Sequence, residues 1–194
     1  MSTPRTRTSR DAFIGAAGVL LRRQGYAATG LNEIVERSGA PKGSLYFHFP
    51  GGKEQLAVAA MKDQGERLRS AITATLAADE DLGQALGNLL DALAAGLQSS
   101  GYRDGCPIAT ITLEAAADSG AVRAAADEIF QGWLAELQAR LLHTGLDAQS
   151  SRRRAMTILA SIEGALILAR AQQDVEPLHA VAAELREQAA RTGG

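Results

Sequence analysis

The sequence has little of what several protein classes depend on. Its 194 residues include one cysteine, Cys106, so neither an intrachain disulfide nor a multi-cysteine zinc site can form. Aromatic residues make up only 4% of the chain, whereas β-sandwiches and barrels favour aromatic and β-branched residues. No run approaches the roughly 18 consecutive apolar residues of a membrane span, and no apolar signal core follows the basic residues 1–7. We therefore expect a cytoplasmic protein with no membrane partner.

Catalytic and cofactor motifs are also missing from the sequence. The three histidines, His48, His143 and His179, are scattered along the chain. There is no glycine-rich phosphate loop, no cluster of metal-ligating residues and no arrangement typical of a catalytic triad. The sequence therefore predicts no enzyme activity, no cofactor and no metal.

What is present favours helices and an uneven distribution of charge. Hydrophobic residues make up 46% of the chain, and most are alanine and leucine, which are good helix formers. Residues 1–53 hold eight Lys or Arg and three acids, a net charge of +5, whereas the remainder holds 12 basic and 19 acidic residues, a net charge of −7. A basic head of this kind suggests binding to a polyanion such as DNA, with an ordinary solvated surface as the alternative.

The spacing of apolar residues predicts an all-α fold of about nine helices. We expect a loose basic arm at residues 1–7, a helix from Thr8 to Gly25, a second capped by Thr29, and a third with Pro41 at its first position. Longer helices are expected over 54–78, 79–98, 122–141 and 152–173, with one opening near Cys106 and one after Pro177. We expect a three-helix DNA-binding domain at 1–53 and a helical ligand-binding and dimerisation domain at 54–194.

Residues 29–49 have the pattern of a helix-turn-helix. Two short apolar-faced segments are joined by a tight turn at Ser38-Gly39-Ala40. In the second segment Leu45 and Phe49 can face a small core with Phe13 and Ile34. The outer face, which suits phosphates, sugars and thymine methyl groups, is then left with Lys42, Ser44, Tyr46, Phe47 and His48.

Residues 13–56 resemble the DNA-binding region of the TetR family of transcriptional repressors. The resemblance rests on Thr29, Ile34-Val35, Ser38-Gly39-Ala40, Pro41-Lys42-Gly43-Ser44-Leu45-Tyr46, His48-Phe49 and Lys53-Glu54-Gln55-Leu56. It implies phosphate contacts by Lys42, Tyr46 and His48, backbone contacts by Thr29 and Lys53, and base-edge or methyl contacts by Gly43, Ser44 and Phe47. Alternatively, Tyr46 packs between helices, His48 caps its helix and Lys53 is solvated.

Further motifs resemble the LmrA/YxaF-like subgroup of this family. These are the extra glycine in Pro50-Gly51-Gly52, the segment Asp104-Gly105-Cys106-Pro107-Ile108-Ala109, and Ile162-Glu163-Gly164-Ala165-Leu166. The resemblance implies a response to drug-like or flavonoid-like molecules and a helical ligand-binding domain.

A small hydrophobic inducer needs a pocket lined mainly by apolar and aromatic groups. Trp133 is the strongest single candidate, because it offers a flat face and one N–H donor. Glu114 either orients a ligand or lies at the surface. The full set of candidates, for each of which plain core packing is the alternative, is Leu93, Leu97, Cys106, Ile108, Ile111, Phe130, Trp133, Leu134, Leu137, Ile162 and Leu166.

One short recognition helix reads few base pairs, so the motif implies a homodimer on a palindromic operator. The resemblance implies a four-helix interface from the last two long helices. Packing of these residues inside the protomer is the alternative. The candidates are Ser161, Gly164, Ala165, Leu168, Ala169, Leu178, Val181 and Leu185.

The sequence therefore predicts a TetR-family regulator that binds double-stranded operator DNA as a homodimer and is released by a small hydrophobic inducer. The alternative is a DNA-binding regulator without small-molecule input, controlled by a protein partner or by oxidation of Cys106.

Overall fold

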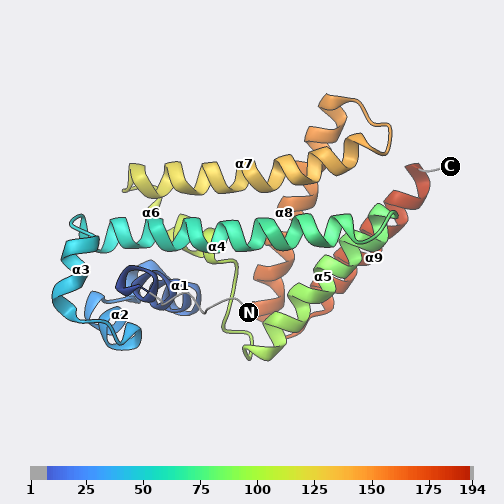
Figure 1. Cartoon of the computed structure of the whole chain (residues 1–194). Helices are drawn as coiled ribbons and strands as arrows, with labels where there is room; N and C mark the ends of the chain where they lie inside the picture. The colour runs from blue at the N-terminus through green and yellow to red at the C-terminus, as the bar shows by residue number, and fades with distance from the viewer. Residues whose placement is uncertain (1–7, 193–194) are drawn as a thin grey trace, which may run out of the picture. The chain divides into compact units, whose positions relative to one another are not determined.

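A computed structural model describes residues 8–192, and the predicted arm at residues 1–7 lies outside them. Over the described range the chain forms nine α-helices and no strand, which confirms the all-α prediction. The helices (Figure 1) are α1 Ser9–Ala28, α2 Leu31–Ser38, α3 Lys42–His48, α4 Gly52–Ala77, α5 Leu82–Ser99, α6 Pro107–Ala115, α7 Gly120–Leu142, α8 Ala148–Gln172 and α9 Glu176–Thr192.

Polar side chains set several helix starts. The Thr8 hydroxyl accepts the Asp11 N–H at 3.2 Å, and the Asp11 carboxylate accepts the Thr8 N–H, which completes a capping box for α1. Asp81 caps α5 through the Gln84 N–H. Asp147 caps α8, so that α8 begins four residues before its predicted start at Arg152. The backbone N–H groups that bind the Asp147 carboxyl lower its pKa.

Internal contacts divide the chain into two compact units. The first unit is Met1–Gly65 with Pro107–Asp127, and the second is Glu66–Cys106 with Glu128–Gly194. Helices α4 and α7 contribute to both units. This division differs from the predicted boundary at residue 53, because α6 packs against α1. The predicted boundary separates functions and stays a prediction.

The core of the first unit is built around α1, which contacts α2, α3 and α6. Phe13, Ile34, Leu45 and Phe49 are all buried, as the sequence predicts. The Phe13 and Phe49 rings pack edge to face with centroids 6.4 Å apart. This contact fixes the end of α3 against α1.

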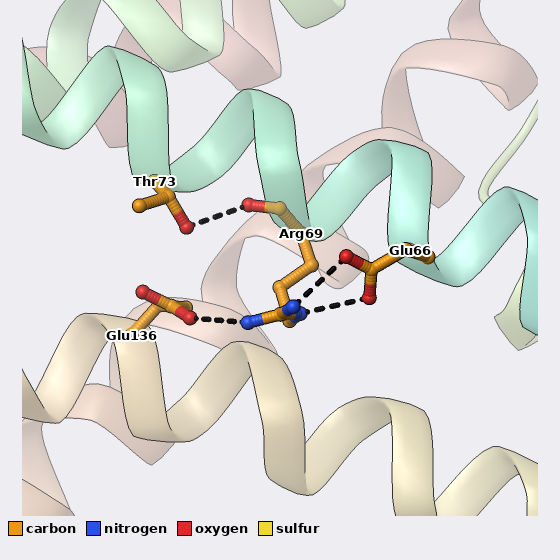
Figure 2. A network of polar contacts seen from close by, with 4 residues as sticks. All are labelled: Glu66, Arg69, Thr73 and Glu136. Carbon is orange, nitrogen blue, oxygen red and sulfur yellow. Dashed lines mark hydrogen bonds and ion pairs between the residues drawn. The ribbon is translucent and has the colours of Figure 1, made fainter.

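In the second unit α9 packs along α5 and also contacts α8. Figure 2 shows how the Arg69 guanidinium joins α4 to α7, with Glu66 on its own helix and Glu136 on the neighbouring one. The Arg69–Glu136 and Arg69–Glu66 N···O distances are both 2.8 Å. The hydrogen bond from Arg69 lowers the pKa of Glu66. Arg140 of α7 further donates to the backbone carbonyls of Leu76, at the end of α4, and of Asp79 and Glu80, which follow the helix.

Among the described helices, α8 alone is long and apolar enough to span a membrane by length and composition. About a third of its most apolar stretch (33%) is buried within the chain. Core helices of water-soluble proteins pass the same test, so this single helix is weak evidence for a membrane segment.

Candidate DNA-binding surface

Helices α2 and α3 are joined by a tight turn. Gly39 ends α2 with φ +66°, a left-handed conformation that favours glycine. The Ser38 hydroxyl donates to the Val35 carbonyl at 2.8 Å and accepts the Ala40 N–H at 3.1 Å. Because these bonds are all local, they set the turn from its own residues, and the element is a helix-turn-helix.

The outer face of α3 exposes large aromatic side chains. Phe47 is 81% exposed and Tyr46 is 56% exposed, whereas the preceding residue, Leu45, is buried. Lys42 and Gly43 are exposed, whereas Ser44 and His48 are half-buried. Exposure of large aromatic side chains to water is unfavourable. A surface that combines them with a lysine is typical of an interaction site.

The structure bears on the alternative role of Tyr46, whereas both roles of His48, DNA contact and helix cap, stay predictions. Tyr46 is more than half exposed, which disfavours packing between helices. The His48 ring makes edge contacts with Phe47 and Phe49, with centroids 5.1 and 6.4 Å away. These contacts orient the imidazole at the end of α3, where it is half-buried.

Thr29 has a role that differs from its prediction. Its side chain is 1% exposed, and its hydroxyl donates to the Gly25 carbonyl at 2.7 Å. The N-cap residue of α2 is Gly30, so the predicted cap at Thr29 is wrong. Because the hydroxyl is buried and bonded inside the first unit, we replace its predicted DNA contact with a structural role.

Pro41 also differs by one position. It is the N-cap of α3, with ψ 130°, and the helix begins at Lys42. A residue that precedes the helix still needs no N–H partner inside it, so proline remains compatible with the site. The Ser44 hydroxyl donates to the Pro41 carbonyl at 2.7 Å.

Lys53 lies over the Tyr26 ring, with its ammonium nitrogen 4.4 Å from the ring centroid. The same nitrogen is 3.4 Å from the Ala27 carbonyl oxygen. A cation over an aromatic face is attracted to it and loses some freedom. Lys53 is therefore half-buried and held in place, so the alternative of a freely solvated lysine is disfavoured.

Three residues of the first unit that sequence reasoning did not place at the site belong to its framework. The guanidinium carbon of Arg10, on α1, lies 5.7 Å from the Phe49 ring centroid. The Tyr26 ring lies under the Lys53 ammonium group. Glu114 of α6 accepts the Ala27 N–H at 2.7 Å. The basic composition of the head pointed to Arg10, but nothing in the sequence pairs Glu114 with a residue 87 positions away.

The predicted ligand-lining residues fall into both units. Ile108 and Ile111 are buried in the first unit, on α6. Burial fits a pocket wall as well as plain core packing, so their ligand contact stays a prediction. The other nine belong to the second unit, where Trp133 is 3% exposed and packs edge to face on Phe130 with centroids 5.4 Å apart. Those nine are Leu93, Leu97, Cys106, Phe130, Trp133, Leu134, Leu137, Ile162 and Leu166.

One pair in the second unit joins a thiol to a carboxyl group. The Cys106 thiol and the Glu163 carboxyl are hydrogen-bonded. Burial raises the pKa of Glu163, and the bond from Cys106 opposes that rise.

Within the described residues no group of three or more His, Cys, Asp or Glu could hold a metal ion.

The predicted dimer residues divide into buried and accessible sets. Ala165, Ala169, Leu178 and Leu185 are buried within the single chain, so a partner cannot reach them and packing inside the protomer accounts for them. Leu168 is 53% exposed. Ser161, Gly164 and Val181 are half-buried. Two further large apolar side chains of α8, Met156 and Ile167, are 49% and 57% exposed.

Comparison with known families matches both parts of the chain. Residues 13–60 match the model of bacterial regulatory proteins of the TetR family, and residues 83–184 match the C-terminal domain of LmrA/YxaF-like transcriptional regulators. The HTH-type transcriptional regulator LmrA of Bacillus subtilis is 34% identical over 170 residues, which cover 88% of this chain and 90% of LmrA. YxaF of the same organism is 32% identical over 91% of this chain and 93% of its own length.

Solved structures agree on the fold. A TetR transcriptional regulator from Legionella pneumophila superposes with a TM-score of 0.83 and 21% identity, over 95% of this chain and 99% of the other.

The exposed face of α3 leads to a mutational prediction. We expect Lys42→Ala and Tyr46→Ala each to weaken DNA binding by about tenfold or more while the helical content stays unchanged, because both side chains are exposed. Lys42→Ala should also lower the slope of log affinity against log salt by about one per protomer, since a lysine–phosphate contact releases a counterion. Lys62→Ala, an exposed lysine on α4, is the charge-matched control. Unchanged affinity in both variants would contradict the assignment of this face.

Proposed function

Since the chain belongs to the TetR family of bacterial transcriptional regulators, in its LmrA/YxaF-like group, we propose that it is a repressor that binds a palindromic operator as a homodimer and is released by a small hydrophobic molecule. Proteins of this family are regulators and not enzymes. The observation that carries the proposal is the face of α3, where Lys42, Tyr46 and Phe47 are exposed. The place of action is the cytoplasm, where its DNA partner lies.

Recognition of DNA follows from the chemistry of that face. Lys42 supplies a cation for a phosphate, and Tyr46 a hydroxyl. The Phe47 ring is apolar and suits the methyl group of thymine in the major groove, while Gly43 allows close approach of the backbone. The seven residues of α3 reach only a few base pairs, so a useful operator needs two such helices about 34–36 Å apart, one helical turn of DNA.

Support for a dimer comes from α8. Met156, Ile167 and Leu168 leave apolar surface exposed on one helix. A Cβ added to Gly164 would meet nothing within 4 Å, so the protomer does not need glycine there for its own packing. The half-buried Ser161 and Val181 complete the accessible part of the predicted face. A second copy of α8 would cover these groups in a two-fold interface.

Support for a hydrophobic ligand comes from the interior of the second unit. Phe130 and Trp133 present perpendicular aromatic rings there, and the Glu163 carboxyl and the Cys106 thiol add polar groups to the same unit. A few polar groups among apolar ones is the usual composition of sites for drug-like molecules. A ligand of this kind acts as an inducer if it binds better to the conformation that does not fit the operator.

The alternative of control by Cys106 oxidation has less support. A reactive cysteine needs a thiolate in a positive environment. The Cys106 thiol is instead hydrogen-bonded to a carboxyl group. A carboxyl group supplies no positive charge to stabilise a thiolate, so ligand control is the better-supported mode.

The function is tested by a gel shift at fixed salt with DNA from immediately upstream of the gene that encodes this protein. We expect binding that a random duplex of equal length does not compete away, because base contacts add to the phosphate contacts that any DNA offers. The double variant Lys42→Ala/Tyr46→Ala should lose the preference. Equal affinity for both duplexes, with operator selection from a random library also failing, would contradict operator binding.

Dimerisation is tested by Gly164→Arg. A long charged side chain at this position would separate two α8 helices, so we expect a monomer by sedimentation or light scattering at concentrations where the wild-type chain is a dimer. Gly96→Arg on α5 is the matched control, because a Cβ there also meets nothing within 4 Å. A dimer that persists in Gly164→Arg would exclude this face from the interface.

Ligand binding is tested through Trp133, the chain's one tryptophan. A planar flavonoid should quench its fluorescence with saturation and, over the same concentration range, release the operator, since the ring is buried in the second unit. N-acetyltryptophanamide corrects for absorption by the flavonoid. Quenching no stronger than in that control, for both a flavonoid and a drug panel, would favour a regulator without small-molecule input.

A further inference from the structure

The bend in α1 is held by a carboxylate from a distant part of the chain. Gly25 interrupts the helix with φ +79° and ψ −178°, and we name residues 25–29 the Gly25 bend. The Ala27 N–H, within this bend, donates to Glu114 Oε2 at 2.7 Å. A hydrogen bond from an N–H group to a carboxylate is stronger than a hydrogen bond between two neutral groups.

The bend leaves no room for another residue at position 25. A Cβ built on Gly25 would lie 2.7 Å from the Glu114 carboxyl carbon and 2.9 Å from Oε2. The positive φ is in any case a conformation that residues other than glycine rarely adopt. The conformation of Gly25 and the position of the Glu114 carboxylate are therefore matched to each other.

Residues in and just before the bend also contact α2 and the start of α4. Thr29 closes it with a hydroxyl bond to the Gly25 carbonyl, and Lys53 lies over Tyr26 within it. The side chain of Gln24, just before the bend, donates to Glu33 on α2 at 2.7 Å. Because α2 begins two residues after the bend, the direction of α2, and of α3 after it, depends on the geometry held by Glu114.

This bond also crosses the boundary between the two matched family segments. Ala27 lies within residues 13–60, which match the N-terminal TetR model, whereas Glu114 lies within residues 83–184, which match the C-terminal regulatory model. Both residues belong to the first compact unit. A movement of α6 that withdrew Glu114 would release the bend directly.

We propose that Glu114 is a positioning residue for DNA recognition: its carboxylate, carried by α6, fixes the Gly25 bend and so sets the orientation of α2 and α3 needed for the operator. The residue makes no contact with DNA in this scheme. The inference rests on the proposed operator binding and adds the group through which α6 acts on it.

The test compares three variants of the full chain. Glu114→Ala removes the acceptor, and Glu114→Gln keeps a carbonyl oxygen for the Ala27 N–H. Asp118→Ala removes the same charge from an exposed position in the same unit. Affinity is measured for the operator and for a random duplex at one salt concentration, and the thermal unfolding midpoint is recorded for each variant.

We expect Glu114→Ala to lose about tenfold or more in operator affinity, the size expected for one charge-assisted hydrogen bond. Its affinity for the random duplex should be unchanged or slightly higher, because an acidic group has been removed. Glu114→Gln should retain most of the operator preference, and Asp118→Ala all of it. A general loss of stability would instead lower both affinities together with the unfolding midpoint.

Amide exchange of the DNA-free protein gives a second readout. The Ala27 N–H should exchange faster in Glu114→Ala than in the wild-type chain or Asp118→Ala, since its acceptor is gone. Unchanged exchange at Ala27, or an unchanged operator preference in Glu114→Ala, would overturn the inference while leaving the proposed function intact. Absence of operator preference in the wild-type chain would overturn both.

Discussion

The interruption of α1 at Gly25 is the constraint on which the DNA-binding surface depends. The φ and ψ of Gly25 break the helical path of α1 shortly before its end at Ala28. Helix α2 follows at Leu31 and buries Ile34, as α1 buries Phe13. A break exposes backbone groups that a continuous helix would satisfy, and these need partners. Here the Thr29 hydroxyl and the Glu114 carboxylate supply two of them.

From this bend onward, each part of the motif is set by a short-range contact. Gly39 and Ser38 reverse the chain between α2 and α3, and Leu45 and Phe49 anchor α3 in the core. Burial of these anchors forces the intervening Tyr46 and Phe47 outward, because neighbouring residues on a helix point about 100° apart. The exposure of these aromatics is thus a consequence of the anchors, and it creates the surface proposed to meet DNA.

The sequence was sufficient where function and structure depend on local patterns. The nine helices follow from apolar periodicity and from caps such as Asp81 and Asp147. The turn at Gly39 and the core around Phe13 follow in the same way. Thr29 was misplaced because a threonine before a short apolar segment fits a cap, and only the bend shows that its hydroxyl is directed back to Gly25.

Long-range partners could not be inferred from periodicity. Small residues such as Ala165 and Ala169 suit close packing against any helix, and only the fold shows that they are already buried within the protomer. Likewise Glu114 is an exposed acid, as one of the two predicted alternatives had it, and only the packing of α6 against α1 shows that it accepts the Ala27 N–H. Helix α6 packs against α1, although its sequence belongs to the segment that matches the C-terminal domain model. The two matched segments therefore share one compact unit. A change in α6 therefore reaches the bend through direct contact and needs no longer chain of residues between them.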